Sequence, residues 1–196
     1  MYRVLRRSIS STVDRSVLPV RLALTECLVA GLNENREFVG MPGCPSPVAK
    51  RVAELERRAI VQAALEDPID LVWTTELDVR TSLPPGAPHL DLGTAGLTLA
   101  ISSVGGYPTS SCNAGVFGER KHHEDFPLVA FFCTRRLFDL IKSIAHRHSL
   151  GLYNAEEDGQ VVIFANDIGN FASAALDLLE YSMRTVRGHT PRTQSR

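Results

Sequence analysis

The fold is decided by residues 91–133, which begin with DLGTAGLTLAISSVGGYPTSSCNAG (91–115) and end with PLVAFFC (127–133). The first part predicts a helix with Asp91 as its N-cap, because apolar residues recur there at the spacing of one helix face. These residues are Leu97, Ala100, Ile101 and Val104, and the polar face holds Thr94, Thr98, Ser102 and Ser103. Gly105 and Gly106 end the helix, because glycine adopts the left-handed conformation of a C-cap without a Cβ penalty.

Two strands follow this helix. Tyr107–Cys112 is a short extended run of small side chains, with a proline near its beginning where the missing N–H does least harm. Pro127–Cys133 is a continuous apolar run of strand length, which is typical of a central strand covered on both faces. We expect the two strands to pair.

Another helix and a hairpin are predicted downstream. Thr134 predicts the N-cap of an amphipathic helix. The apolar side of this helix carries Leu137, Leu140, Ile141, Ile144, Ala145 and His148. Leu150–Asn154 and Gln160–Ala165 flank an Asp-Gly pair, which indicates a β-hairpin.

A last amphipathic helix begins at Asn166 or Asp167. Its apolar side carries Phe171, Ala175, Leu178, Leu179 and Ser182. The order helix, strand, strand, helix, strand, strand, helix predicts an α+β fold, in which helices pack on an antiparallel or mixed sheet. We place this domain at 91–185 and expect a disordered basic tail at 186–196.

Residues 1–90 are interpreted as a helical N-terminal extension with loops rich in proline and glycine. Ser46 and Pro47 open a helix that runs to about Leu65. Its apolar side carries Val52, Leu55, Ala59 and Ala63, and its charged face carries Arg51, Glu54, Arg57 and Arg58. Such a face is typical of a solvated surface, with a nucleic-acid surface as the alternative. Ile69–Thr75 predicts a further strand.

Composition limits the classes of protein. Apolar residues make up 44% of the chain, enough to bury a real core. The formal net charge of −1 gives no reason to expect DNA or an anionic membrane as a partner. The four cysteines form no C-x-x-C pair and no secretory signal precedes them, which favours reduced thiols in a cytoplasmic protein. No apolar run reaches the roughly 18 residues of a membrane-spanning helix.

The N-terminus leaves two interpretations open. Residues 1–24 carry five arginines and several serines, with Asp14 as their only acid, which suits an organellar import sequence that is cleaved off. The alternative is a basic arm before an ordinary helix. Val17–Leu32 favours this alternative, because Val20, Leu24 and Leu28 recur at helical spacing.

A candidate ligand-binding segment joins the first predicted helix to the central strand. Its residues are Thr109, Ser110, Ser111, Cys112, Asn113 and Gly115, with Arg120 and His122 from the following loop. Small side chains and glycines leave backbone and hydroxyl groups accessible to a small polar ligand. A purely structural segment at this place is expected to carry larger β-branched residues. The competing interpretations are a buried structural thiol at Cys112 and a solvent-facing histidine at His122.

We expect no metal at this segment. Cys112, His122 and His123 would supply three ligands at most, whereas a structural zinc site requires four.

The sequence Gly-Tyr-Pro-Thr-Ser-Ser-Cys-Asn-Ala-Gly (106–115) and the order of elements around it resemble the wybutosine-synthesising tRNA methyltransferases (Tyw3-like) over residues 91–181. This resemblance implies an RNA methyltransferase that uses S-adenosylmethionine, with Ser110, Ser111 and Cys112 at the positions of the family motif. The family pattern Thr-Ser-Ser-Cys-x-Gly-Arg is not kept after Cys112, because both Asn113 and Ala114 precede the glycine and Val116 stands directly after it in place of the arginine.

Three classes of function stay open at this point. The first is a domain that binds or modifies RNA, a nucleotide or a cofactor at the candidate segment. The second is a non-catalytic protein-interaction module of the adaptor, antitoxin or immunity type, whose N-terminal helices contact a protein partner. The third is a degenerate enzyme fold kept as a scaffold, so the sequence does not decide whether the protein is an enzyme.

Overall fold

The computed structural model describes residues 44–63, 75, 78–79, 81–82, 90–116, 124, 126–154 and 160–187. Its elements are α3 (Ser46–Ala63), α5 (Ala95–Ser103), β1 (Tyr107–Cys112), β2 (Leu128–Phe132), α6 (Arg135–Arg147), β3 (Gly151–Asn154), β4 (Val161–Phe164) and α7 (Gly169–Arg187). The predictions for 1–43, 117–123 and 188–196, which include Arg120 and His122, lie outside the described residues. Of the predicted strand Ile69–Thr75 only Thr75 is described, and it is helical.

The four described strands form one sheet in the order β1-β2-β4-β3, and every neighbouring pair is antiparallel. The α+β prediction is therefore confirmed, and the sheet is antiparallel rather than mixed. As expected, β1 pairs with β2, and β3 pairs with β4 as a hairpin. The predicted central strand β2 lies between β1 and β4 and is buried along its whole length.

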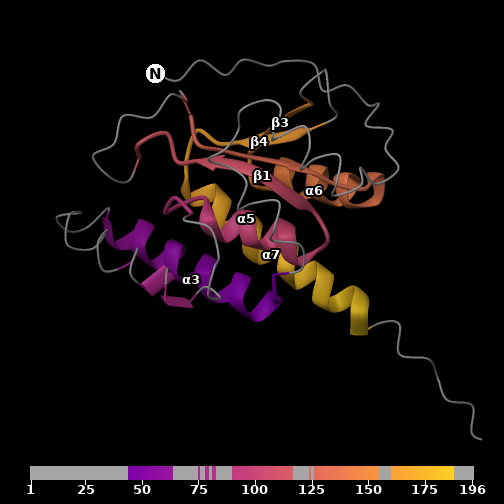
Figure 1. The fold of residues 1–196 in the computed structure, drawn as a ribbon, viewed down its shortest axis with the longest axis horizontal. Helices are drawn as coiled ribbons and strands as arrows, with labels where there is room; N and C mark the ends of the chain where they lie inside the picture. Colours follow the sequence, from indigo (N-terminus) through magenta and orange to yellow (C-terminus); the bar gives the residue numbers. More distant parts are fainter. Residues whose placement is uncertain are drawn as a thin grey trace, which may run out of the picture.

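The described helices lie on one side of the sheet (Figure 1). α5, α6 and α7 share a buried core with the sheet residues Val129, Phe131, Val161 and Ile163. α3 contacts α5 and α7 on the side away from the strands, so it forms a third layer (Figure 1). This helix comes from the predicted N-terminal extension, and its Ala49, Val52 and Ala53 belong to the same core. None of the described helices is long and apolar enough to cross a membrane.

α5 differs from its prediction at its start. The helix begins at Ala95, and the carbonyl of Asp91 accepts the N–H groups of Thr94 and Ala95 in a preceding turn. Asp91 is therefore not the N-cap, and its carboxylate instead accepts the N–H of Asn113. The predicted helix end is confirmed, because Gly105 has a φ of 93° and the N–H of Gly106 donates to the carbonyl of Ile101.

The polar face predicted for α5 is also buried. Thr94, Thr98 and Ser102 are fully buried, because the helix is enclosed between the sheet and α3. Their hydroxyl groups bond to the backbone: Thr94 donates to the Asp91 carbonyl, Thr98 donates to the Thr94 carbonyl, and Ser102 accepts the Cys44 N–H. A buried hydroxyl is tolerated when it has a hydrogen-bond partner, so this central helix contains three of them.

The two later helices follow the prediction closely. Thr134 caps α6 by accepting the N–H of Leu137 at 3.3 Å. Asp167 accepts the N–H of Gly169 at the start of α7. The apolar sides of both helices enter the common core, where Leu137, Ile141, Leu178 and Leu179 are buried.

Candidate functional site

The candidate segment follows β1, and the pleat of this strand separates its side chains. Ser110 lies opposite Ala130 and Cys112 lies opposite Leu128, whereas Ser111 lies opposite Val129 on the side of the helices. Successive strand residues point to opposite faces of a sheet. Ser111 and Cys112 therefore face opposite sides of the sheet, and no ligand on one side can contact both side chains.

Thr109 lies at an irregularity in the pairing of β1 with β2. The register shifts between Pro108 and Ser110, which leaves Thr109 as an extra residue in the strand. Thr109 is buried, with 2% of the residue exposed, and its hydroxyl accepts a hydrogen bond from the side-chain amide of Gln160, the residue before β4. The contact reaches across the sheet and gives Thr109 a role in holding the strands together.

Asn113 ties the end of β1 to the turn before α5. The buried side-chain amide donates to the carbonyl of Leu92 at 3.1 Å and accepts the N–H of Gly115 at 3.0 Å. The backbone N–H of Asn113 donates to the carboxylate of Asp91 at 3.4 Å. Ala114 and Gly115 both have positive φ, 54° and 73°, so the chain turns sharply here. Asn113 and Gly115 thus form a turn that is bonded to the α5 side of the molecule.

The last two candidate groups differ in their hydrogen bonding. The sulfur of Cys112 accepts the N–H of Ala114 at 3.3 Å. Burial, with a smaller contribution from Asp91 and Glu124, raises the pKa of the Cys112 thiol, so the group is less reactive than an exposed cysteine. The hydroxyl oxygen of Ser111 is buried and has no hydrogen-bond partner among the residues that the structure describes. Ser111 therefore carries a buried hydroxyl group that no described residue bonds.

A charged residue that sequence analysis missed lies at the centre of the helical layer. Glu56 of α3 is fully buried and accepts three backbone N–H groups at the start of α5. One oxygen accepts the N–H groups of Gly93 at 2.7 Å and Ala95 at 3.0 Å, and the other accepts Gly96 at 2.8 Å. These N–H groups have no partner within their own helix, so a side chain from another helix caps α5.

The burial of Glu56 changes its ionisation. Burial raises its pKa from 4.5 to about 7, although the three N–H donors act in the opposite direction. Both carboxylate oxygens are already bonded, so we assign Glu56 a structural role. One sequence signal indicates this residue: Glu56 lies four residues after Val52 and three before Ala59, within the apolar side of the helix.

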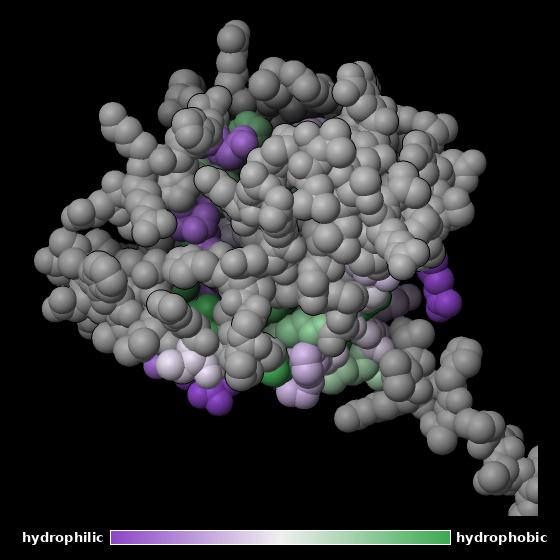
Figure 2. Space-filling model, in the orientation of Figure 1, coloured by the Kyte–Doolittle hydropathy of each residue, from purple (hydrophilic) through white to green (hydrophobic). Residues whose placement is uncertain are grey.

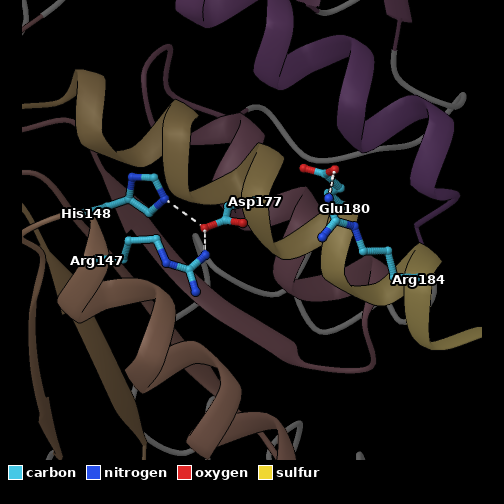
Figure 3. A network of polar contacts seen from close by, with 5 residues as sticks. All are labelled: Arg147, His148, Asp177, Glu180 and Arg184. Atoms are coloured by element: carbon cyan, nitrogen blue, oxygen red, sulfur yellow. Dashed lines mark hydrogen bonds and ion pairs between the residues drawn. The ribbon is translucent and has the colours of Figure 1, made fainter.

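A second polar network joins α6 to α7 at the surface (Figure 3). One oxygen of Asp177 contacts both the guanidinium of Arg147 and, at 3.1 Å, the Nε2 atom of His148. Partial burial opposes ionisation of Asp177, but hydrogen bonds from His148 and Arg147 hold its pKa below the usual value. Glu180 lies one turn after Asp177 on α7 and pairs with Arg184, a further turn along the same helix (Figure 3). The network acts as a tether between two helices.

The residues that the structure describes contain no group of three histidine, cysteine or acidic side chains that could hold a metal ion. The fold defines the chain as an α+β protein with a four-stranded antiparallel sheet and helices on one side. Comparisons with protein-family models, with curated proteins and with solved structures find no match.

Proposed function

We propose that this protein is a non-catalytic interaction module that binds an acidic protein surface through α3. The proposal rests on the outward side of this helix. Its exposed residues there are Pro47, Lys50, Arg51, Arg57, Arg58, Val61 and Gln62. At 100° per residue they fall within one arc of the helix, opposite the buried Ala49, Val52 and Ala53. Four of these seven side chains are cationic, which is the charge that an acidic partner would complement.

Among the described residues, one of these four cationic side chains has an acidic partner. Lys50 lies 3.9 Å from Glu54, a weak surface pair. No ion pair or hydrogen bond of the Arg51, Arg57 or Arg58 side chains is present within the described residues. Val61 is 58% exposed and places an apolar side chain among them. In Figure 2 strongly hydrophilic and hydrophobic residues are both visible along the lower edge, where Figure 1 draws α3. Arginine and an apolar neighbour are common in protein interfaces.

The experiment isolates complexes of the tagged full-length chain and compares two double charge reversals. R51E/R58E changes residues one heptad apart on α3, and the matched control R136E/K142E changes two exposed residues of α6. We expect R51E/R58E to lower recovery of a protein partner by roughly tenfold, since two lost charge contacts are worth more than 1 kcal/mol. The control should retain the partner, and nuclease treatment should not release it.

Two results would overturn the proposal. Equal loss of the partner in both double variants would show a general effect of charge. Release of everything bound by nuclease would show that the basic face binds RNA instead.

A second candidate function is binding of a small polar ligand, such as a nucleotide or S-adenosylmethionine, on the helix side of β1. The unpartnered hydroxyl of Ser111 favours it, because a buried polar group without a partner is unusual in a native protein. The resemblance of the 106–115 motif to RNA methyltransferases supports the same proposal. Native mass spectrometry of the full-length chain and of S111A tests it: a co-purified molecule should be present in the first and absent in the second.

A further inference from the structure

α3 forms the third layer of the fold and is held to the domain from one side. It contacts α5 and α7, whereas the residues on its outward side are exposed (Figure 1). The apolar residues that it buries are mostly small: Ala49, Val52, Ala53 and Ala59, with Leu55 and Ile60 partly buried beside them. A small side chain removes little apolar surface from water. Apolar packing therefore holds α3 less firmly than the inner helices.

Glu56 supplies the hydrogen bonds by which α3 holds the start of α5. Its Oε1 atom accepts the N–H groups of Gly93 at 2.7 Å and Ala95 at 3.0 Å, and its Oε2 atom accepts the N–H of Gly96 at 2.8 Å. Each oxygen of a carboxylate has two acceptor positions. Both positions of Oε1 are therefore occupied, whereas Oε2 keeps one position for a proton. The carboxyl group fits this site in either ionisation state with the same three hydrogen bonds.

The two helices packed against α3 bring no cation to Glu56. α5 and the turn before it, residues 91–103, contain Asp91 as their one charged residue. On α7 Asp177 pairs with side chains of α6, and Glu180 pairs with Arg184 (Figure 3). Tyr181, the other titratable group of α7, is 53% exposed.

α3 itself has no second charge on its buried side. Its other charged residues are all exposed or half-exposed: Lys50, Arg51, Glu54, Arg57 and Arg58. Glu56, in contrast, is fully buried. Among the described residues, a negative charge on this carboxyl group would therefore have three N–H dipoles as its only compensation for the loss of water.

We propose that α3 is a pH-controlled outer helix, which separates from α5 and α7 as a unit when Glu56 ionises, while the sheet stays folded with α6 and α7 packed on it. The separated helix exposes the carboxyl group to water, where a charge is stabilised. The docked helix favours the neutral form. Separation is therefore coupled to the loss of one proton.

The direction of the pH effect follows from this coupling. Burial raises the pKa of Glu56 from 4.5 to about 7 in the docked helix. The stabilisation of the docked helix is fully present below pH 4.5 and is lost as pH rises through about 7. Between pH 6 and pH 8 the equilibrium should shift about tenfold toward the separated helix. The inference does not rest on the proposed function, because separation is measured in the chain without a partner.

Native-state hydrogen exchange of the full-length chain, followed by NMR, tests the proposal. The reporters are the backbone N–H groups of Gly93 and Gly96, which lose Glu56 as their acceptor when α3 separates. Their protection factors, corrected for the intrinsic effect of pH on exchange, should fall about tenfold between pH 6 and pH 8. Glu54→Gln, which removes a half-exposed acid of the same helix, should show the same fall, and Glu56→Gln should show none.

A second comparison distinguishes separation of α3 from unfolding of the whole domain. The central strand β2 opens only when the domain unfolds, so the N–H groups of Val129 and Phe131 should be protected roughly tenfold or more above the two reporters. Low concentrations of denaturant should accelerate exchange of the reporters less than exchange of β2. The reason is that separating one helix exposes less surface than unfolding the domain.

The wild-type chain alone decides the proposal, whether or not Glu56→Gln folds. Constant protection of Gly93 and Gly96 between pH 6 and pH 8 would show that ionisation of Glu56 does not release the helix. Equal protection and equal denaturant dependence at the reporters and at β2 would show that α3 leaves only when the whole domain unfolds. Either result would overturn the proposal.

Discussion

α5 and α6 pack on the same side of one sheet, yet they depend on the rest of the chain to different degrees. α6 has its own cap in Thr134 and keeps one side in water, with five buried residues among thirteen. α5 has eight buried residues among nine and no side-chain cap of its own. Its first N–H groups bond to Glu56, which is 37 to 40 residues away in the sequence. A helix with a solvent side can be specified locally, whereas an enclosed helix needs its neighbours.

The largest effect that tests this comparison is expected at Glu56. Glu56→Ala leaves the buried N–H groups of Gly93 and Gly96 without an acceptor, whereas Ala95 keeps the Asp91 carbonyl, so we expect the free energy of unfolding to fall by about 3–5 kcal/mol. Denaturant titration of the purified chain measures this change. The exposed neighbour provides the control, since Arg57→Ala should alter stability by less than about 0.5 kcal/mol. Equal stability of both variants would show that α5 does not depend on the carboxylate.

The pH dependence of stability gives the next largest effect. The pKa of Glu56 is about 7 in the folded chain against an ordinary value of 4.5, so the folded state holds a proton that the unfolded state has lost between these values. The stabilisation that results from the raised pKa of Glu56 is fully present below pH 4.5. It is lost as pH rises through 7, and the free energy of unfolding falls by roughly 3 kcal/mol in total.

Glu56→Gln has no titrating group at this position. The difference in unfolding free energy between wild type and this variant should therefore fall from pH 4.5 to 8. A difference that rises with pH would show that the three N–H donors lower the pKa of Glu56 by more than burial raises it.

A smaller effect is expected from the close approach of α3 and α5. A Cβ atom at Gly96 would lie 2.6 Å from a Glu56 carboxylate oxygen and 2.7 Å from the Cα atom of Ala53. Gly96→Ala should cost about 1–3 kcal/mol, because the two helices have to move apart. The control on α6 is Ser143→Ala, at an exposed position, which should leave the melting temperature almost unchanged. A stabilised Gly96→Ala protein would mean that helix propensity outweighs the contact.

The smallest effect concerns the local cap of α6. Thr134→Ala removes the acceptor of the Leu137 N–H and should cost about 1 kcal/mol, the usual value of an N-cap. Thr134→Ser keeps the hydroxyl and should restore most of this loss in the same unfolding experiment. If Thr134→Ser is as unstable as Thr134→Ala, the helix start is stabilised by packing of the threonine methyl group and not by the hydrogen bond to the hydroxyl.

In the candidate segment, the secondary structure is predictable from the sequence, but the hydrogen-bond partners of its polar side chains are not. The small polar residues of Tyr107–Cys112 predicted a strand, and it is present. The strand alternation that divides Ser111 from Cys112 follows from the sequence once β1 is assigned. The partners of Thr109 and Asn113, however, come from Gln160 and Leu92, which lie 51 and 21 residues away. Whether a polar side chain is accessible depends on such distant partners, which no local pattern contains.

The sequence by itself determined β2, α6, α7, the β3–β4 hairpin and the glycine end of α5, because apolar periodicity, caps and turn residues act within a few positions. Only the tertiary structure decided that the hydroxyl groups of α5 are buried, that Glu56 caps this helix, and that Phe164 lies over Gly151. Each of these features joins surfaces far apart in the chain. Their free energy comes from burial and hydrogen bonds that exist only once those surfaces are packed together.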